Sequence, residues 1–393
     1  MNVTTHAGRA RTGLLLLCLL AASASAYTLY FANLHSHTSY SDGVRFPRDA
    51  YRYARDTAHV QVLAVTDHDF LLTYPEFVST LAQADSATEP GRFLALRGFE
   101  WSSQSDGHMN IFETDTFVSR ENVPGISQFF PWLYTQPNAI GQFNHPGSGD
   151  FNNFHYTARA DTEMTLCEMK TVNQSARFSM ALDSGWHVGA SAGQDNHLAD
   201  WGAERNLTGI WADSLTKGSI LAAIRDMRTY ATMNRNTELE FTANGAWMGS
   251  TVSNGSLHFH VRVSDPDPAD IIQRVELVTN SGLVTQHLDV GNSNSADWSP
   301  NLSTSSGQHR YFFVRVVFND TAWTVSSPIW TTGAAGIEET GQPTANSQQP
   351  SATVLSGALG VVYDAMGRRV AEPRAGVYFV VDSGRTRKVI VAR

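Results

Sequence analysis

Short apolar runs alternate with amphipathic stretches through the first 235 residues of the chain. Between the runs lie segments with helical spacing, at residues 48–59, 75–87 and 219–227. Pro75 fits the first turn of its helix, where a missing N–H costs no hydrogen bond. The runs that resemble interior β-strands cover residues 27–32, 60–65, 93–99, 139–143, 164–169 and 188–192. This alternation predicts an α/β domain over residues 27–235 with a mainly parallel sheet, either open or closed into a barrel.

The pattern changes to strict alternation of apolar and polar residues between positions 236 and 332. Residues 257–263 have this period of two, and turn signals such as Asn254-Gly255 separate the runs. The segment therefore predicts an antiparallel β-sandwich. His258 and His260 share one face of a strand, and we interpret them as a solvent-facing pair because no further acidic or histidine partner is near in sequence.

The N-terminal segment, residues 1–26, has the features of a signal peptide. Arg9 and Arg11 precede an apolar run at residues 14–22, and the small residues 24–26 suit a cleavage site. A membrane-spanning helix needs about 20 apolar residues, so we expect no stable membrane span from this run. We therefore expect the chain to be secreted or displayed at the cell surface.

Composition narrows the possible functions. A formal net charge of −9 argues against a nucleic-acid-binding surface. The only lysines are Lys170, Lys217 and Lys388, so an anionic substrate must be held mainly by metal, arginine or backbone. Removal of the signal peptide would leave Cys167 as the only cysteine, which we interpret as a buried core residue.

Histidines and acidic residues follow the predicted strands of the first domain. Because the carboxyl ends of parallel strands lie on one face of a sheet or barrel, side chains from several strands converge there. Asp42 and His108 are expected in flanking loops of the same region. The complete set of candidate metal ligands is His35, His37, Asp42, His68, Glu100, His108, His145, Asp195 and His197.

The types of these ligands predict the class of metal. Imidazole combined with carboxylate suits Zn, Mn or Fe, whereas calcium prefers oxygen ligands. Nine ligands exceed the need of a single ion, so we expect two or three divalent ions. Glu100 is the candidate bridge, because a carboxylate has two oxygens with which to hold two ions.

The ordered motifs resemble those of the PHP (polymerase and histidinol phosphatase) superfamily, and within it the CehA/McbA-type metallohydrolases. The motifs are Leu34-His35-Ser36-His37 with Asp42-Gly43, Thr66-Asp67-His68, Glu100, His108, Asn144-His145-Pro146 and Asp195-Asn196-His197. The resemblance implies a distorted (β/α)7 barrel with a trinuclear centre. It assigns His35, His37, Glu100 and Asp195 to one ion, Glu100, His108 and His145 to the second, and Asp42, His68 and His197 to the third. The basic residues that hold phosphate in some members have no clear counterpart here.

The function that we predict is hydrolysis of a small-molecule phosphoester by a metal-bridged hydroxide. Glu100 and His108 are the candidate catalytic ligands, and Asp69 is one candidate for the proton donor. Hydrolysis of a carboxylic or carbamate ester, as in CehA, is an alternative that the same motifs allow. A third possibility is a surface adhesion protein in which the metal cluster is only structural.

The C-terminal tail follows a segment typical of a flexible linker, residues 333–350, which is rich in Gly, Thr, Gln, Ser and Pro. Residues 351–393 become strand-like again and resemble the sorting domain of type IX secretion. The resemblance implies a small β-domain that is recognised by the secretion machinery and carries the protein across the outer membrane.

Overall fold

The computed structural model describes residues 27–308 and 310–332, and the backbone of three further strands between residues 361 and 391. One compact unit spans Met1–Gly336 and a second spans Ile337–Arg393. The predicted signal peptide and linker lie outside the described residues. The predicted boundary at residues 235/236 falls within the first unit and stays a prediction.

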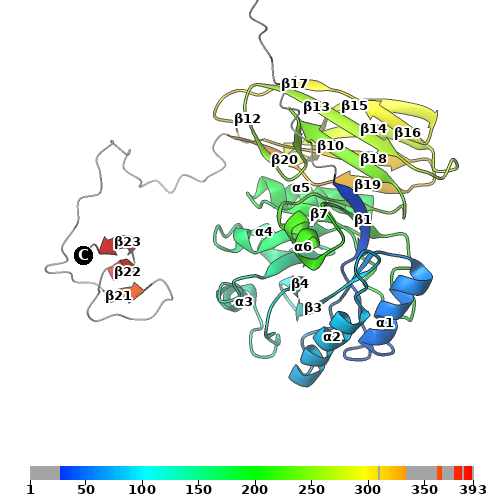
Figure 1. Ribbon diagram of the computed structural model, residues 1–393. Coiled ribbons are helices and arrows are strands. Elements are labelled where there is room, and N and C mark those ends of the chain that lie inside the picture. The colour runs from blue at the N-terminus through cyan, green and yellow to red at the C-terminus, as the bar shows by residue number, and fades with distance from the viewer. Residues whose placement is uncertain (1–26, 309, 333–360, 365–375, 383–384, 392–393) are drawn as a thin grey trace, which may run out of the picture. The chain divides into compact units, whose positions relative to one another are not determined.

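The helices of the first unit are few and short (Figure 1). They are α1 (Pro47–Tyr53), α2 (Tyr74–Ala87), α3 (Ile126–Leu133), α4 (Asp150–Phe154), α5 (Ser175–Asp183) and α6 (Lys217–Arg225). Local sequence explains where α2 begins, because the Glu76 N–H donates to Thr73 Oγ1 and the Glu76 carboxylate accepts from the Thr73 N–H. Shorter helical turns are η1 (Ala54–Ala58), η2 (Ala160–Thr162), η3 (Val172–Gln174) and η4 (Asn280–Gly282).

The first domain is built on nine strands. They are β1 (Thr28–Asn33), β2 (Val62–Val65), β3 (Leu94–Ser103), β4 (Gly107–Phe112), β5 (Ile140–Asn144), β6 (Met164–Glu168), β7 (Gly189–Ser191), β8 (Leu207–Ala212) and β9 (Thr229–Thr232). Six of them overlap the apolar runs of the sequence, so the strand prediction is confirmed there. They are ordered β9-β8-β1-β2-β3-β4-β5-β6-β7 in the sheet.

The direction of these strands is more mixed than the sequence predicted. β1·β2, β2·β3, β5·β6 and β6·β7 are parallel, whereas β3·β4, β4·β5, β1·β8 and β8·β9 are antiparallel. β3 continues past its predicted end and forms a hairpin with β4, so His108 lies on a strand and not in a loop. The described pairings therefore give a sheet of mixed strand direction within an α/β domain. They do not establish the predicted (β/α)7 barrel.

Side-chain hydroxyls connect the two ends of this sheet. The Ala192 N–H donates to Thr208 Oγ1 at 3.0 Å, and this hydroxyl donates to the Ala192 carbonyl at 2.7 Å. Thr229 Oγ1 likewise donates to the Ala190 carbonyl at 2.9 Å. β7 is thereby held against β8 and β9 without a backbone ladder, and the strand ends that carry the candidate ligands are brought around one centre.

Residues 238–332 form a mainly antiparallel sandwich, with β12 parallel to β20, that shares a sheet with the preceding strands. Its strands are β10 (Glu238–Ala243), β11 (Ala246–Trp247), β12 (Thr251–Ser253), β13 (Ser256–Ser264), β14 (Ile272–Thr279), β15 (Leu283–Ser293), β16 (Ser295–Trp298), β17 (Asn301–Ser303), β18 (Tyr311–Phe318), β19 (Trp323–Ser326) and β20 (Ile329–Thr332). β13 alternates buried and exposed residues as predicted. β19 pairs with β9, with Val325 opposite Ala231, so the backbone ladder runs from one domain into the other.

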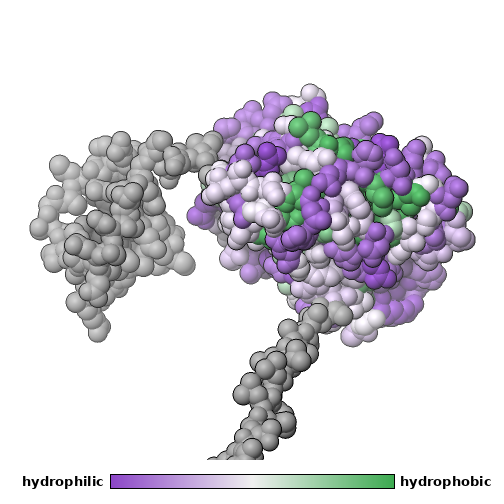
Figure 2. All heavy atoms as spheres, turned by 90° about the horizontal axis from the view of Figure 1, so that it is seen from above, coloured by the Kyte–Doolittle hydropathy of each residue, from purple (hydrophilic) through white to green (hydrophobic). Residues whose placement is uncertain are grey.

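The surface of the sandwich is mostly hydrophilic. Figure 2, which looks onto this side, shows mainly hydrophilic residues with small separate hydrophobic areas. Leu283 and Val284, at the start of β15, are the exposed large hydrophobic residues of the sandwich in the described chain. Small areas of this kind are ordinary for a protein surface.

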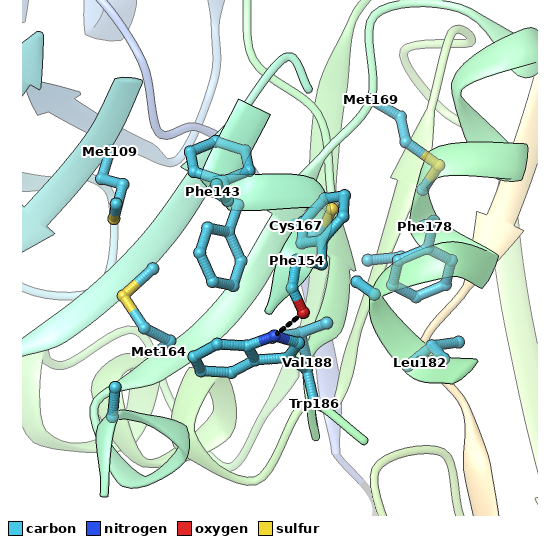
Figure 3. Packing of buried hydrophobic residues seen from close by; sticks show 14 of the residues in the cluster. Met109, Phe143, Phe154, Met164, Cys167, Met169, Phe178, Leu182, Trp186 and Val188 are labelled. Carbon is cyan, nitrogen blue, oxygen red and sulfur yellow. Dashed lines mark hydrogen bonds between the residues drawn. The ribbon is translucent and has the colours of Figure 1, made fainter. Parts of the chain in front are cut away.

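The largest core cluster packs against the face of β5 and β6 that carries Phe143 and Cys167 (Figure 3). Phe143, Cys167 and Trp186 are buried there, and Trp186 Nε1 donates to the Phe154 carbonyl at 3.0 Å. Cys167 is thus a core residue, as predicted, because successive side chains of β6 point to opposite faces and its neighbour Glu168 points the other way. None of the helices in the described residues is long and apolar enough to cross a membrane.

The second unit contributes three strands with an antiparallel ladder. They are β21 (Val361–Asp364), β22 (Gly376–Asp382) and β23 (Arg385–Val391). The strand-like character predicted for the tail is present in these residues, and its role in sorting stays a prediction.

Candidate metal centre

The structure brings all nine predicted ligands together at one end of the first domain. His35 and His37 follow β1, His68 follows β2, Glu100 and His108 lie on β3 and β4, His145 follows β5, and Asp195 and His197 follow β7. Asp42 lies in the loop between β1 and α1. Together with Glu168, these ligands form four overlapping groups that are each compact enough to hold an ion: His37, Asp42, His68 and His197; His35, His37, Glu100 and Asp195; His35, His145 and Glu168; and His68, Glu100 and His108.

One of these groups has donor atoms close enough to share an ion. Nε2 of His35 lies 3.3 Å from Nε2 of His37 and 3.2 Å from Oδ1 of Asp195, and the same oxygen is 2.9 Å from Nε2 of His37. Oε1 of Glu100 lies 3.3 Å from Nε2 of His35, and Oε2 of Glu100 lies 3.4 Å from Nε2 of His37. Ligand atoms about 2.0–2.2 Å from a Zn²⁺ ion are about 3.3–3.6 Å apart in a tetrahedron. Four of these five distances lie within about 0.1 Å of that range, and the contact of His37 with Asp195 is shorter.

Glu100 belongs to two of the four groups, and its bridging role stays a prediction. It is fully buried, and its Oε1 lies 3.1 Å from Nδ1 of His108 and 3.6 Å from Nε2 of His145. Oε2 lies 2.9 Å from Nδ1 of His68, but it is a buried atom without a hydrogen-bond partner in the described chain. A buried carboxylate oxygen without a hydrogen bond fits a cation, because a buried acceptor left without a partner is otherwise costly.

Charge on the carboxylates is favoured by the surrounding imidazoles. Burial alone would raise the pKa of Glu100, but the neighbouring His35 and His108 lower this pKa well below its usual value. Burial also opposes the charge on Asp195, yet His35 and His37 hold the pKa of Asp195 well below its usual value. Both carboxylates are therefore ionised at neutral pH and have lone pairs for a divalent ion.

Glu168 is a residue of the centre to which sequence reasoning gave no role. Its two oxygens lie 3.2 and 3.1 Å from Nδ1 of His35, and Oε2 accepts a hydrogen bond from the His145 N–H at 3.1 Å. Its carboxylate thus orients two of the predicted ligands, as outer carboxylates do around metal-bound histidines. The sequence feature that could have pointed to Glu168 is a charged residue at the end of an otherwise apolar strand.

Gly193 makes room for this contact. A Cβ atom at position 193 would lie 2.5 Å from Oε1 of Glu168 and 2.8 Å from Cβ of His35. The segment that carries Asp195 can therefore approach β1 and β6 only with glycine at this position. Asp195 itself has a φ of 51° and His145 a φ of 29°, a left-handed region that is costly for such residues and is often found at functional sites.

Two aspartates beside His68 support the centre without facing it. Asp67 accepts from the N–H and the hydroxyl of Thr38, both at 2.7 Å, and so anchors the loop that leads to Asp42. Asp69 accepts from the Ser102 N–H at 2.6 Å and from the Arg120 N–H. The carboxylate of Asp69 is thus occupied by backbone donors, and its role as a proton donor stays a prediction.

Histidines outside the centre behave as the sequence suggested. His258 lies 2.6 Å from Oδ1 of Asn301, and Nε2 of His260 lies 3.1 Å from Oδ1 of Asp297. Both are on the exposed face of β13. Neither belongs to a group of potential ligands in the described residues.

Comparison with known proteins gives only distant likenesses. No protein-family model matches the chain, and no curated protein matches it. Among solved structures, a two-domain protein from Bacteroides vulgatus, described as containing a predicted PHP-like metal-dependent phosphoesterase, is 15% identical with a TM-score of 0.44. The match covers 77% of this chain and 96% of that one. Fibronectin(III)-like modules of Clostridium thermocellum CbhA match 24% of this chain and 96% of their own, at 16% identity and a TM-score of 0.18. At these TM-scores the likenesses do not assign the chain to a family, and the function proposed below rests on the geometry of the centre.

Proposed function

We propose that this chain is a metal-dependent phosphoesterase of the PHP type, with a centre for two or three divalent ions. The observation that carries the proposal is the close grouping of donor atoms from His35, His37, Glu100 and Asp195. Glu100 also belongs to the group of His68 and His108, as expected where one carboxylate serves neighbouring ions. The same ligand motifs, in the same order, carry the resemblance to PHP enzymes. We further propose that residues 27–235 form a distorted (β/α)7 barrel, as the resemblance implies.

The chemistry follows from the ligands. Divalent ions bound here would supply an activated water and stabilise negative charge on the substrate's oxygens. In hydrolysis the water oxygen bonds to phosphorus, the ester P–O bond breaks, and the alcohol leaves with a proton. With an ion bound, the Glu168 carboxylate would accept the Nδ1–H of His35 and leave Nε2 free to act as a ligand. Ser102 Oγ, 2.7 Å from Nδ1 of His68, orients that ring in a similar way.

Hydrolysis of a carboxylic or carbamate ester is the second candidate. It is favoured by the absence of arginine from the ion pairs of Asp42, Glu100, Glu168 and Asp195 in the described residues. A neutral ester needs less positive charge than a phosphate dianion. The same centre can activate water for attack at carbon, so measured substrate preference must separate the two.

The test is a pair of matched double variants. His35→Ala/His37→Ala removes two ligands that are two residues apart, and His258→Ala/His260→Ala removes an exposed pair with the same spacing from the sandwich. Metal content by mass spectrometry and turnover of p-nitrophenyl phosphate, bis(p-nitrophenyl) phosphate and p-nitrophenyl acetate are measured for each. We expect the first variant to lose metal and turnover and the second to keep both. Loss of metal without loss of turnover would refute a metal-dependent hydrolase. Bound metal with no turnover of any ester would favour the adhesion alternative.

We also propose that the protein is exported by its N-terminal signal and by type IX secretion. Support comes from the signal-like composition of residues 1–26 and from the resemblance of residues 351–393 to a sorting domain. Intact-mass analysis of protein secreted by a type IX-competent host should find both segments removed. A secreted, unanchored protein that keeps residues 351–393 would contradict the sorting role.

A further inference from the structure

Lys170 lies at the edge of the metal centre. It follows β6 by two residues, and its ammonium group contacts Oδ2 of Asp195. The other oxygen of that carboxylate, Oδ1, is the one that faces Nε2 of His35 and His37. Lys170 is therefore separated from the proposed ion by a single carboxylate.

No other lysine or arginine of the described chain forms an ion pair with a carboxylate of the centre. Asp42, Glu100 and Glu168 have only histidines as ion-pair partners within 4.0 Å. Arg120 also lies near the centre, because its guanidinium packs over the Phe70 ring and donates to the Ser102 carbonyl. Lys170 is thus the basic residue of the described chain that forms an ion pair with a ligand of the centre, in a chain that has only three lysines.

The backbone of Lys170 is anchored while its side chain stays accessible. The Lys170 N–H donates to Oε1 of Gln174 at 2.5 Å, and its carbonyl accepts from Nδ2 of Asn206 at 3.4 Å. The side chain keeps 30% of its surface exposed. A lysine that only neutralised Asp195 could be fully buried, whereas a lysine that binds a ligand must be accessible to it.

Hydrogen-bond capacity points the same way. An ammonium group has three donors, and Asp195 is the one acceptor that contacts this group in the described residues. Two donors remain for an incoming ligand. Contact with an anionic oxygen uses both the charge and a donor, and such charge-assisted bonds are stronger than neutral ones.

From these observations we propose that Lys170 binds a non-bridging oxygen of the substrate and makes the centre selective for anionic esters. The favoured substrate class is then a phosphomonoester, whose dianion gains most from this charge, over a neutral carboxylic ester. The inference rests on the proposed hydrolase function and deepens it.

The test replaces Lys170 in the full-length, metal-loaded protein. Lys170→Met removes the charge and keeps most of the side-chain volume, and Lys170→Arg restores a charge. Lys217→Met is the matched control, because Lys217 pairs with Glu113 at 2.9 Å at the start of α6. Three quantities are measured: metal content, the Kd of inorganic phosphate by calorimetry, and kcat/KM for p-nitrophenyl phosphate and p-nitrophenyl acetate.

We expect Lys170→Met to weaken phosphate binding by about 10- to 100-fold, the usual scale for a hydrogen bond to a charged group. Its loss in kcat/KM should be at least about tenfold greater for the phosphomonoester than for the acetate, with metal content unchanged. Lys170→Arg should recover part of the phosphate affinity. Equal losses on both esters, or lower metal content with unchanged phosphate affinity, would show that Lys170 only supports Asp195 and would overturn the proposal. If the wild type hydrolyses neither ester, the proposed function fails, and the phosphate Kd alone decides the role of Lys170.

Discussion

Substitution of Glu168 by glutamine tests whether the carboxylate behind His35 controls metal affinity. Glu168 is fully buried, and both its oxygens lie within 3.2 Å of Nδ1 of His35. Glutamine keeps the shape of the side chain but places an NH2 group where one of these oxygens was. His35 then loses the charged acceptor that fixes its tautomer, and the His145 N–H loses a charged partner.

Loss of such an outer carboxylate typically lowers metal affinity about 10- to 100-fold, or roughly 1.4–2.8 kcal/mol. We expect the Glu168→Gln variant to fall in this range, because one carboxylate supports two ligands at once. The assay is competition with a chromogenic chelator, with metal content determined by mass spectrometry. Glu204→Gln is the control, because Glu204 is exposed and only its backbone carbonyl contacts Arg235. Affinities of both variants within twofold of the wild type would refute the role assigned to Glu168.

Three further predictions concern the stability and reactivity of the fold. Burial raises the pKa of Tyr51 and Tyr230 well above the usual value of about 10. Because the folded pKa exceeds the unfolded one, the stabilisation is complete below about pH 10 and is lost as pH rises further. The free energy of unfolding should therefore decrease above pH 10. In the folded protein, absorbance at 295 nm should show that these two phenols stay protonated at that pH. Titration of both phenols near pH 10 in folded protein would contradict their burial. Burial also raises the pKa of Cys167, so its thiol should react with Ellman's reagent only after unfolding, and rapid reaction of native protein would be inconsistent with the core packing. Phe143→Ala should lower the free energy of unfolding by about 3–5 kcal/mol in urea titration, because this fully buried ring packs against Phe151 and Trp186; a loss below about 1 kcal/mol would contradict that packing.

The sequence predicted most of the centre because its ligands follow strands. Strand ends on one face of a sheet converge whatever the details of the intervening helices. His35, His68 and Asp195 were found in this way, although more than a hundred residues separate the first from the last. The period of two in β13 was equally informative, because one face of that strand is buried and the other is exposed.

The sequence pattern could not predict which residues and strands far apart in the chain contact each other. The contact of Glu168 with His35 joins residues 133 positions apart, and no local pattern specifies it. The antiparallel hairpin of β3 and β4 depends on packing against β5, so the sequence placed His108 in a loop. The pairing of β19 with β9 is equally long-range, because the sequence predicts only separate sheets for residues 27–235 and 236–332.

Anomalous diffraction from crystals of the metal-loaded protein tests the central claim most directly. Data collected on both sides of the metal's absorption edge locate each ion and identify it. We expect at least two anomalous peaks, one of them surrounded by His35, His37, Glu100 and Asp195 with ligand distances of about 2.0–2.2 Å. A protein saturated with Zn²⁺ or Mn²⁺ that shows no peak among these four side chains would contradict it.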